Sequence, residues 1–279
     1  MTEGLVTKKI TNLFEVETRS CVLTVSSRGN LKADGVFVGD KVVVSSENII
    51  EKVLPRKNIL VRPPLANLDR MIIVVSSVPM YDPLLLDKLL IFCALNGIQP
   101  IICINKTDLT SLDDVKEVYG KFYKVIKASA VLSETSEVVK EIKGITAFAG
   151  QSAVGKSSII NAIFGNEIAG VGELSKKIER GKQTTRVSQL YKVNKGYIAD
   201  TAGFSMLDEG LFNIEANELK NHYPDFEKAT KDCRFGNSCL HDKEQNCGVK
   251  KAVECGIINE ERYNRYIRLL NSLQSRKKY

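Results

Sequence analysis

The first sixty residues consist of short apolar, strand-like runs separated by turn-forming residues. Pairs such as Gly39-Asp40 separate the runs, and short runs separated by turn residues are typical of β-structure. Several strands in so short a segment indicate a small barrel, for which an OB-type fold is the natural candidate. A β-module without a binding role is the alternative that this segment leaves open. The expected strands are residues 4–10, 13–18, 21–26, 35–38 and 41–44.

Between about residues 65 and 211 the pattern changes to strands without polar positions, alternating with helices. Strands that lack polar alternation are buried on both faces, which indicates a parallel sheet covered by helices. Asp82 and Pro83 provide an N-cap and a first helical residue, and Gly97 ends that helix. The class is therefore α/β, with strands expected at 71–77, 100–105, 125–128, 145–149 and 197–200 and helices at 83–96, 111–122 and 156–164.

Beyond residue 213 the chain becomes helical and charged, surrounds a cluster of cysteines and a histidine, and ends in a basic helix. Pro63 and Pro64 mark the first boundary, because proline cannot continue a strand or a helix without strain. We therefore expect three domains. They are a β-barrel (OB-fold) domain at 1–62, an α/β domain at 63–212 and a mostly helical domain at 213–279.

Composition restricts the class of protein. In a chain of 279 residues, 43% hydrophobic and 26% charged residues exclude wholesale disorder. No uncharged apolar run approaches the roughly 18 residues of a membrane span, and the N-terminus lacks a signal pattern, so we expect a cytoplasmic protein without membrane contact. Seven cysteines, an odd number, argue against a disulfide framework. The net charge of +7 is compatible with a polyanionic partner.

Residues 150–157, with the sequence GQSAVGKS, match the phosphate-loop pattern G-x-x-x-x-G-K-[ST] between an expected strand and an expected helix. Glycines let backbone N–H groups turn toward a phosphate chain, and the helix N-terminus adds its dipole. Lys156 would neutralise the β- and γ-phosphates, and the Ser157 hydroxyl would bind Mg²⁺. The candidate nucleotide-binding residues are Gly150, Gln151, Ser152, Ala153, Val154, Gly155, Lys156, Ser157 and Ser158.

Residues 105–108, Asn-Lys-Thr-Asp, follow an apolar strand and match the N-K-x-D pattern. The Asp108 carboxylate can accept hydrogen bonds from both N1–H and N2–H₂ of guanine, whereas adenine offers an acceptor that repels it. Asn105 would support the loop and the base, with Thr107 beside it, while the Lys106 stem lies along the ring. After the next strand, the loop of Ser129 and Ala130 would bring a backbone amide to the guanine carbonyl.

A third pattern, Asp200-x-x-Gly203, would place Asp200 near Mg²⁺ through water and the Gly203 N–H near the γ-phosphate. Residues 181–186 lie between this pattern and the phosphate loop. Thr184 and Thr185 belong to this segment, and Thr185 is the candidate to complete the Mg²⁺ shell. A plain polar turn is the alternative for the segment.

The order of these motifs is unusual, because the guanine-specifying residues 105–108 precede the phosphate loop by more than forty residues. A parallel sheet tolerates such a circular permutation. As a consequence, the segment that senses the γ-phosphate leads directly into the C-terminal domain, so nucleotide state could be transmitted there by ordering or releasing that segment.

The C-terminal domain contains Cys233-x₅-Cys239-x-His241-x₅-Cys247, a Cys₃His set suited to a structural zinc ion. Iron at this site stays an alternative. Cys255 could replace one ligand, but its helical surroundings favour a place in the core.

The last helix carries a stripe of arginines and interleaved tyrosines. Such a stripe would contact RNA phosphates and stack on bases, or it would form a solvated helix face. The sequence favours neither. The arginines at a three-residue spacing are Arg262, Arg265 and Arg268.

Taken together, these features resemble the RsgA/YjeQ family of circularly permuted GTPases. The resemblance covers nearly the whole chain: the barrel, residues 66–69 at the start of the GTPase domain, the motif order and the trailing zinc cluster. It implies an OB-fold and a zinc-binding domain that both contact ribosomal RNA. It also implies a GTPase stimulated by the small ribosomal subunit and acting late in its maturation.

Several positions depart from the family pattern or from other GTPases, among them Ala202, where the family usually has a proline, and the spacing of Cys233 and Cys239, which is one residue longer than usual. Gln183 stands where the family usually has a histidine, so Gln183 would have to position water if that histidine does so. Phe204 stands where many GTPases carry a water-positioning glutamine, and an apolar ring predicts slow intrinsic hydrolysis that a partner or another segment completes. Ala153 replaces an asparagine that some GTPases use to bind K⁺, so that route of activation is not expected.

The sequence therefore predicts a monomeric GTP hydrolase that uses GTP, Mg²⁺ and one structural Zn²⁺, and that binds the small subunit and its rRNA. A nucleotide-gated RNA-binding assembly factor with negligible turnover is the first alternative. An ATP-using phosphate-loop enzyme is the second, and it would require residues 105–108 to be accidental.

Overall fold

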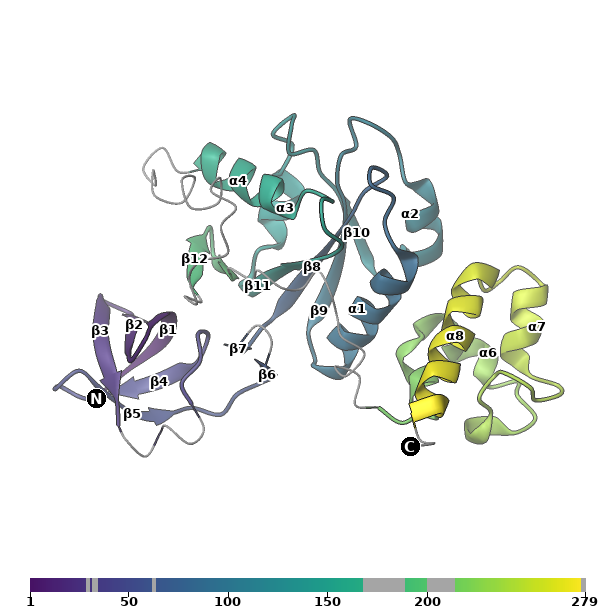
Figure 1. Cartoon of the computed structure of the whole chain (residues 1–279), viewed down its shortest axis with the longest axis horizontal. Helices are drawn as coiled ribbons and strands as arrows, with labels where there is room; N and C mark the ends of the chain where they lie inside the picture. Colours follow the sequence, from purple (N-terminus) through teal and green to yellow (C-terminus); the bar gives the residue numbers. More distant parts are fainter. Residues whose placement is uncertain (29–30, 32–34, 62–63, 168–188, 200–213, 277–279) are drawn as a thin grey trace.

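The computed structural model describes residues 1–28, 31, 35–61, 64–167, 189–199 and 214–276. Three regions follow one another along the chain: a β-barrel, a sheet flanked by helices, and a helical region that carries the C-terminus (Figure 1). None of the helices in these described ranges combines the length and the apolar character that a membrane span requires.

The N-terminal region is a closed barrel with the strand order β1-β2-β3-β5-β4, which confirms the expected barrel. Neighbouring strands are antiparallel except for the parallel pair β3–β5. Inward-facing side chains such as Val6, Phe14 and Val25 form its separate core. The strands are β1 (Thr2–Ile10), β2 (Leu13–Thr18), β3 (Val22–Ser27), β4 (Lys41–Val44) and β5 (Ile49–Val53).

One expected barrel strand was wrong and one real strand was missed. Residues 35–38 form a loop that closes on Asp40, because the Phe37 N–H donates to Asp40 Oδ2 at 2.8 Å. Asp40 is fully buried and pairs with Arg56, whose Nε lies 2.7 Å from Oδ1. The fifth strand is instead β5, which follows the sharp turn at Asn48.

The central sheet has the order β10-β9-β8-β11-β13-β12. All neighbours are parallel except β12, which pairs antiparallel with β13 at the edge. The expected parallel α/β sheet is therefore present, with one additional edge strand. The strands are β8 (Arg70–Val75), β9 (Gln99–Ile104), β10 (Lys124–Lys127), β11 (Gly144–Ala149), β12 (Leu190–Val193) and β13 (Gly196–Ala199).

Helices cover both faces of this sheet, and successive residues of β8 alternate between the two cores. Met71 and Ile73 belong to the core that also contains Leu89 of α1, whereas Ile72 packs in the core that contains Ile159 of α4. The alternation follows from the two-residue period of a strand. The helices are α1 (Pro83–Leu95), α2 (Asp113–Tyr119), α3 (Ser136–Glu141) and α4 (Lys156–Glu167).

The C-terminal region consists of short helices around the long helix α8, and it lies beside α1 and α2 in Figure 1. Its apolar residues, including Tyr266 and Leu270, belong to the same core as α1. A hairpin of β6 (Ile59–Val61) and β7 (Pro64–Ala66) connects the barrel to the sheet. The C-terminal elements are η3 (Leu219–His222), η4 (Pro224–Phe226), α6 (Glu227–Thr230), η5 (Gly236–Ser238), α7 (Gly248–Glu254) and α8 (Glu260–Arg276).

Candidate functional site

The phosphate loop leaves β11 and enters α4, as the sequence predicts. Its two glycines are required by close approach: a Cβ on Gly150 would lie 2.3 Å from the Val74 carbonyl oxygen, and a Cβ on Gly155 would lie 2.3 Å from Asn105 Nδ2. Both glycines also have positive φ angles, 130° and 97°. A side chain at Gly150 would displace the backbone of β8, and one at Gly155 would displace the Asn105 amide.

The Lys156 ammonium lies across the loop. Its Nζ donates to the carbonyl oxygens of Gly150 and Gln151, both at 2.7 Å. Burial lowers the pKa of Lys156, so an anion in the loop would restore the favourable surroundings of the ammonium. The three serines proposed to contact nucleotide are exposed, which leaves their hydroxyls accessible: Ser152, Ser157 and Ser158.

The N-K-x-D segment at the end of β9 contacts the phosphate loop directly. Asn105 is buried and its Nδ2 donates to the Val154 carbonyl at 2.9 Å. Lys106 Nζ donates to the carbonyls of Ala153 at 3.0 Å and of Val78 at 2.5 Å. Two motifs that lie more than forty residues apart in the sequence are thus adjacent, as expected where parallel strands end at one edge of a sheet.

Asp108 is positioned by the loop that follows β10. Ser129 is fully buried, and its hydroxyl donates to Asp108 Oδ1 at 2.6 Å. Ala130 is half-buried beside it, and Thr107 Oγ1 donates to the Ala128 carbonyl at 3.1 Å. The sequence suggested only a backbone amide from this loop, whereas its serine side chain also orients the carboxylate.

The remaining candidates for catalysis and Mg²⁺ binding lie outside the described residues. The last described residue before the third motif is Ala199, at the end of β13, which runs parallel to β11. The candidates in question are Gln183, Thr184, Thr185, Asp200 and Gly203.

The structure brings the Cys₃His set together in the C-terminal region. All four residues are buried, and their potential ligand atoms lie within 4.8 Å of one another. Cys233 Sγ lies 3.8 Å from Cys247 Sγ and 3.6 Å from His241 Nδ1, and Cys247 Sγ lies 3.4 Å from Nδ1. A tetrahedral zinc ion with ordinary bond lengths requires S–S edges of about 3.8 Å and S–N edges of about 3.5 Å. The cluster therefore fits zinc binding.

Burial favours the uncharged forms of these groups when no cation is bound. Burial raises the pKa of Cys239 to about 12 and lowers the pKa of His241 to about 4. The imidazole is therefore neutral at pH 7, whereas the thiols need a nearby positive charge to ionise. His241 Nε2 lies 3.5 Å from Thr230 Oγ1, a contact that orients the ring. Cys255 is exposed and lies outside the cluster, so the expectation that it is part of the core was wrong.

The arginine stripe of α8 divides between the interior and the surface. Arg262 is 2% exposed and Arg265 is half-buried, and both pair with Asp87 of α1, whereas Arg268 is exposed. The first two side chains are thus unavailable to RNA in this structure. Sequence reasoning missed Asp87, although a carboxylate within the apolar run of residues 83–92 is a signal that a buried partner exists.

A parallel sheet with a phosphate loop after β11 and an N-K-x-D motif after β9 defines a protein of the GTPase class whose motifs occur in permuted order. The sequence profile of the RsgA GTPase family matches residues 53–209, and the chain belongs to that family. The small ribosomal subunit biogenesis GTPase RsgA of Clostridium acetobutylicum is 39% identical over 291 residues, which covers 99% of each chain.

Two solved structures have the same fold. YjeQ from Thermotoga maritima superposes with a TM-score of 0.80 at 34% identity and covers 98% of both chains. YloQ, described as a circularly permuted GTPase, superposes with a TM-score of 0.82 at 32% identity, over 100% of this chain and 97% of the other. The resemblance drawn from the sequence is confirmed.

Proposed function

We propose that this protein is a GTPase of small ribosomal subunit maturation that hydrolyses GTP to GDP and phosphate when the subunit stimulates it. One observation carries the nucleotide assignment: Asn105 and Lys106 of the N-K-x-D motif donate to the carbonyls of the phosphate loop. A base bound at Asp108 and phosphates bound at the loop would therefore belong to one nucleotide. The names of the relatives support the ribosomal role.

The described residues, together with sequence motifs that lie outside them, suggest how the chain would hold GTP. Asp108, held by Ser129, would accept the N1–H and N2–H₂ donors of guanine, and the Lys106 stem would lie along the ring. Lys156 would move from the loop carbonyls to the β- and γ-phosphates, because a phosphate oxygen is the stronger acceptor. Mg²⁺ would neutralise developing phosphate charge, held by Ser157 and Thr185 directly and by Asp200 through water. Gly203 and Gln183 would contact the γ-phosphate and the attacking water.

We further propose one structural zinc ion, bound by Cys233, Cys239, His241 and Cys247. The observed S–S and S–N separations support tetrahedral binding. Metal analysis of the purified protein distinguishes the alternatives. One equivalent of zinc supports the zinc assignment, whereas one equivalent of iron would show that the site binds iron instead.

The rRNA of the small subunit is the proposed macromolecular partner, and the cytoplasm, where subunits mature, is the proposed location. The net charge of +7 suits a polyanion. We propose that the chain acts as a monomer; the barrel and the C-terminal region flank the central α/β region on different sides (Figure 1).

GTP hydrolysis with and without isolated small subunits tests the proposal. The control is Asp108→Asn, in which an amide replaces one acceptor oxygen by a donor. This variant should lose stimulated turnover of GTP and gain turnover of xanthosine triphosphate, whose C2 carbonyl accepts from the new amide. Competition by ATP checks the choice of base, because an ATP-using enzyme would prefer ATP.

Phe204 in place of a water-positioning glutamine favours one second candidate, a nucleotide-gated assembly factor with negligible turnover. Subunit binding that depends on GTP, without stimulated hydrolysis, would support that candidate. If the protein neither binds small subunits nor hydrolyses GTP in their presence, the ribosomal role is wrong.

A further inference from the structure

Helix α1 begins at the phosphate loop. Its N-cap residue, Asp82, accepts the backbone N–H groups of Leu84 at 2.8 Å and Leu85 at 3.2 Å through Oδ1. The Asp82 backbone N–H in turn donates to Gln151 Oε1 at 3.0 Å. Gln151 is the second residue of the phosphate loop, so the start of α1 and the loop are joined by a hydrogen bond.

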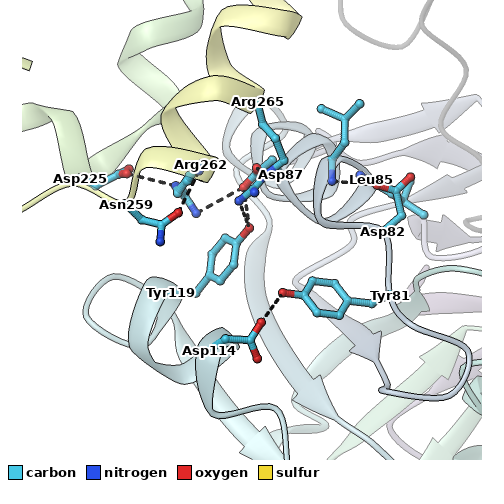
Figure 2. Close-up of polar contacts among 11 residues, drawn as sticks. Tyr81, Asp82, Leu85, Asp87, Asp114, Tyr119, Asp225, Asn259, Arg262 and Arg265 are labelled. Carbon is cyan, nitrogen blue, oxygen red and sulfur yellow. Dashed lines mark hydrogen bonds and ion pairs between the residues drawn. The ribbon is translucent and has the colours of Figure 1, made fainter. Parts of the chain in front are cut away.

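Further along α1, the side chain of Asp87 faces the C-terminal region and is 1% exposed. Its Oδ2 accepts from Arg265 Nε at 2.5 Å and its Oδ1 accepts from the Tyr119 hydroxyl at 2.9 Å. Arg262 Nη1 lies 3.3 Å from the same Oδ1. Figure 2 shows these side chains converging on Asp87 from α2 and α8.

Arg262 is the centre of this contact on the side of α8. Its guanidinium lies 4.6 Å from the ring centroid of Tyr119 and 5.2 Å from that of Tyr223, and its Nε lies 3.1 Å from Asp225. Burial disfavours the charged form, but Asp87 and Asp225 outweigh that effect and raise the pKa of Arg262. The two carboxylates and the two aromatic faces hold this buried cation by charge attraction, whereas its Nε and Nη1 atoms make no hydrogen bond in this arrangement.

We propose that Arg262 and Arg265 are positioning residues for the phosphate loop, acting through Asp87 and the N-terminus of α1. Because a helix rises about 1.5 Å per residue, Asp87 lies only about 7.5 Å along the axis from the Asp82 N-cap. Holding Asp87 therefore fixes the place at which the Asp82 N–H meets Gln151. The inference rests on the proposed nucleotide site.

The loop that precedes α1 also links this helix to the nucleotide site. The Val78 carbonyl, in the loop before α1, accepts from Lys106 of the base-recognition motif at 2.5 Å. The loop and the start of α1 thus contact both nucleotide motifs, while Asp87 contacts α8. If α8 no longer binds Asp87, the N-terminus of α1 is held less rigidly, and so are its contacts with the two nucleotide motifs.

The test compares Arg265→Gln with Arg268→Gln in the full-length protein. Both substitutions remove one charge from the same helix, but Arg268 is exposed and has no ion-pair partner among the described residues. Binding of a fluorescent GDP analogue is measured by titration, with zinc content as a check on the C-terminal fold. We expect Arg265→Gln to weaken binding about fivefold and Arg268→Gln to leave it unchanged.

The route through Gln151 is tested by a double-mutant cycle. In a Gln151→Ala background the link from α1 to the phosphate loop is broken and only the contact between Val78 and Lys106 remains, so Arg265→Gln should weaken binding by much less than it does in the wild type. An undiminished effect of Arg265→Gln in that background would overturn the proposal, as would equal affinity of the wild type and Arg265→Gln.

If Arg265→Gln loses its zinc, Tyr119→Phe provides a milder variant that keeps the ring and removes one donor to Asp87. It should weaken binding about twofold, and unchanged affinity would overturn the proposal. A wild type that binds no GDP analogue would instead contradict the proposed function, so the two failures are distinguishable.

Discussion

The nucleotide site and the metal cluster are assembled in opposite ways. The nucleotide motifs at 105–108, 128–130 and 150–157 are far apart in the sequence and meet because buried parallel strands end at one edge of the sheet. The metal ligands all lie between residues 233 and 247, on short helices and loops. The first site is held by an apolar core whether or not a ligand is bound. The second depends on the ion that its side chains would bind, because so short a segment has little core of its own.

Removal of the metal should have the largest effect. Apparent binding energies of structural zinc ions reach about 10 kcal/mol or more, and this energy is folding energy for the segment that binds the ion. A strong chelator, or Cys247→Ser, should therefore unfold the C-terminal region and expose the rings of Tyr223 and Tyr266, which pack edge to face in its core. Tyrosine fluorescence and near-UV circular dichroism report this change. Binding of GDP should weaken severalfold but persist. A complete loss of GDP binding would contradict the claim that the nucleotide site is held by its own apolar core.

A core substitution in the sheet should have the next largest effect. Phe148 lies in β11, directly before the phosphate loop, and is 2% exposed. Phe148→Ala should lower the free energy of unfolding by about 3–5 kcal/mol through the lost burial and the remaining cavity. Urea denaturation followed by far-UV circular dichroism measures the change. Phe122→Ala, at a position that is 43% exposed, is the control and should cost less than about 1 kcal/mol. Similar costs for both variants would refute the role of the core.

A smaller, pH-dependent effect is expected at Glu141, which ends α3 and pairs with Arg70 and Lys124 at the starts of β8 and β10. Burial alone would raise the pKa of Glu141, but Lys124 and Arg70 outweigh it and hold the pKa below the usual 4.5. The folded-state pKa is depressed, so the stabilisation is present above about pH 4.5 and is lost as the pH falls through the lower folded value. Glu141→Gln should therefore cost about 1–2 kcal/mol at pH 7, and the difference from the wild type should shrink in acid. Thermal unfolding from pH 7 to pH 3 tests this, and a constant difference would argue against it.

The smallest effect is expected within the phosphate loop itself. Ala153 has a φ angle of 65°, which is strained for a residue with a Cβ atom. Ala153→Gly should remove that strain, and after the added entropy of the unfolded chain the net gain is about 0.5 kcal/mol, or about 1–2 °C in Tm. Ala147→Gly, the same change in the regular strand β11, should destabilise instead. Destabilisation by both substitutions would show that the loop carries no such strain.

The features that the sequence predicted well are those with local or periodic signals. Fully apolar strands and the phosphate-loop pattern identify the sheet and its site edge, and the spacing of Cys233, Cys239, His241 and Cys247 identifies the cluster. The strand expected at 35–38 failed because Asp40 binds the Phe37 N–H and stabilises a turn instead. A local side-chain hydrogen bond of this kind competes with strand pairing, and it does not alter the hydrophobic periodicity from which strands are predicted.

The environment of the arginine stripe could not be predicted, for a physical reason. Helical spacing shows that Arg262, Arg265 and Arg268 share a face, but not what covers it. The partner of Arg265, Asp87, lies 178 residues earlier in the chain. Only the tertiary fold brings α1 and α8 together, so the difference between a buried ion pair and an exposed arginine three residues later is invisible in the sequence. The roles of Gln183, Thr185 and Asp200 stay predictions.

The position of β8 has a consequence for synthesis of the protein. This strand lies between β9 and β11, yet its partner residue for Arg70 in β11 is Thr146, 76 residues later in the chain. At a translation rate of about 5–20 residues per second, β11 is synthesised roughly 4–15 s after β8, and until then this edge of β8 has no partner strand. During this interval the nascent chain has made its base-recognition strand but not its phosphate loop. Protection of an exposed strand edge by a chaperone during these seconds would therefore determine how much of the chain reaches the folded state.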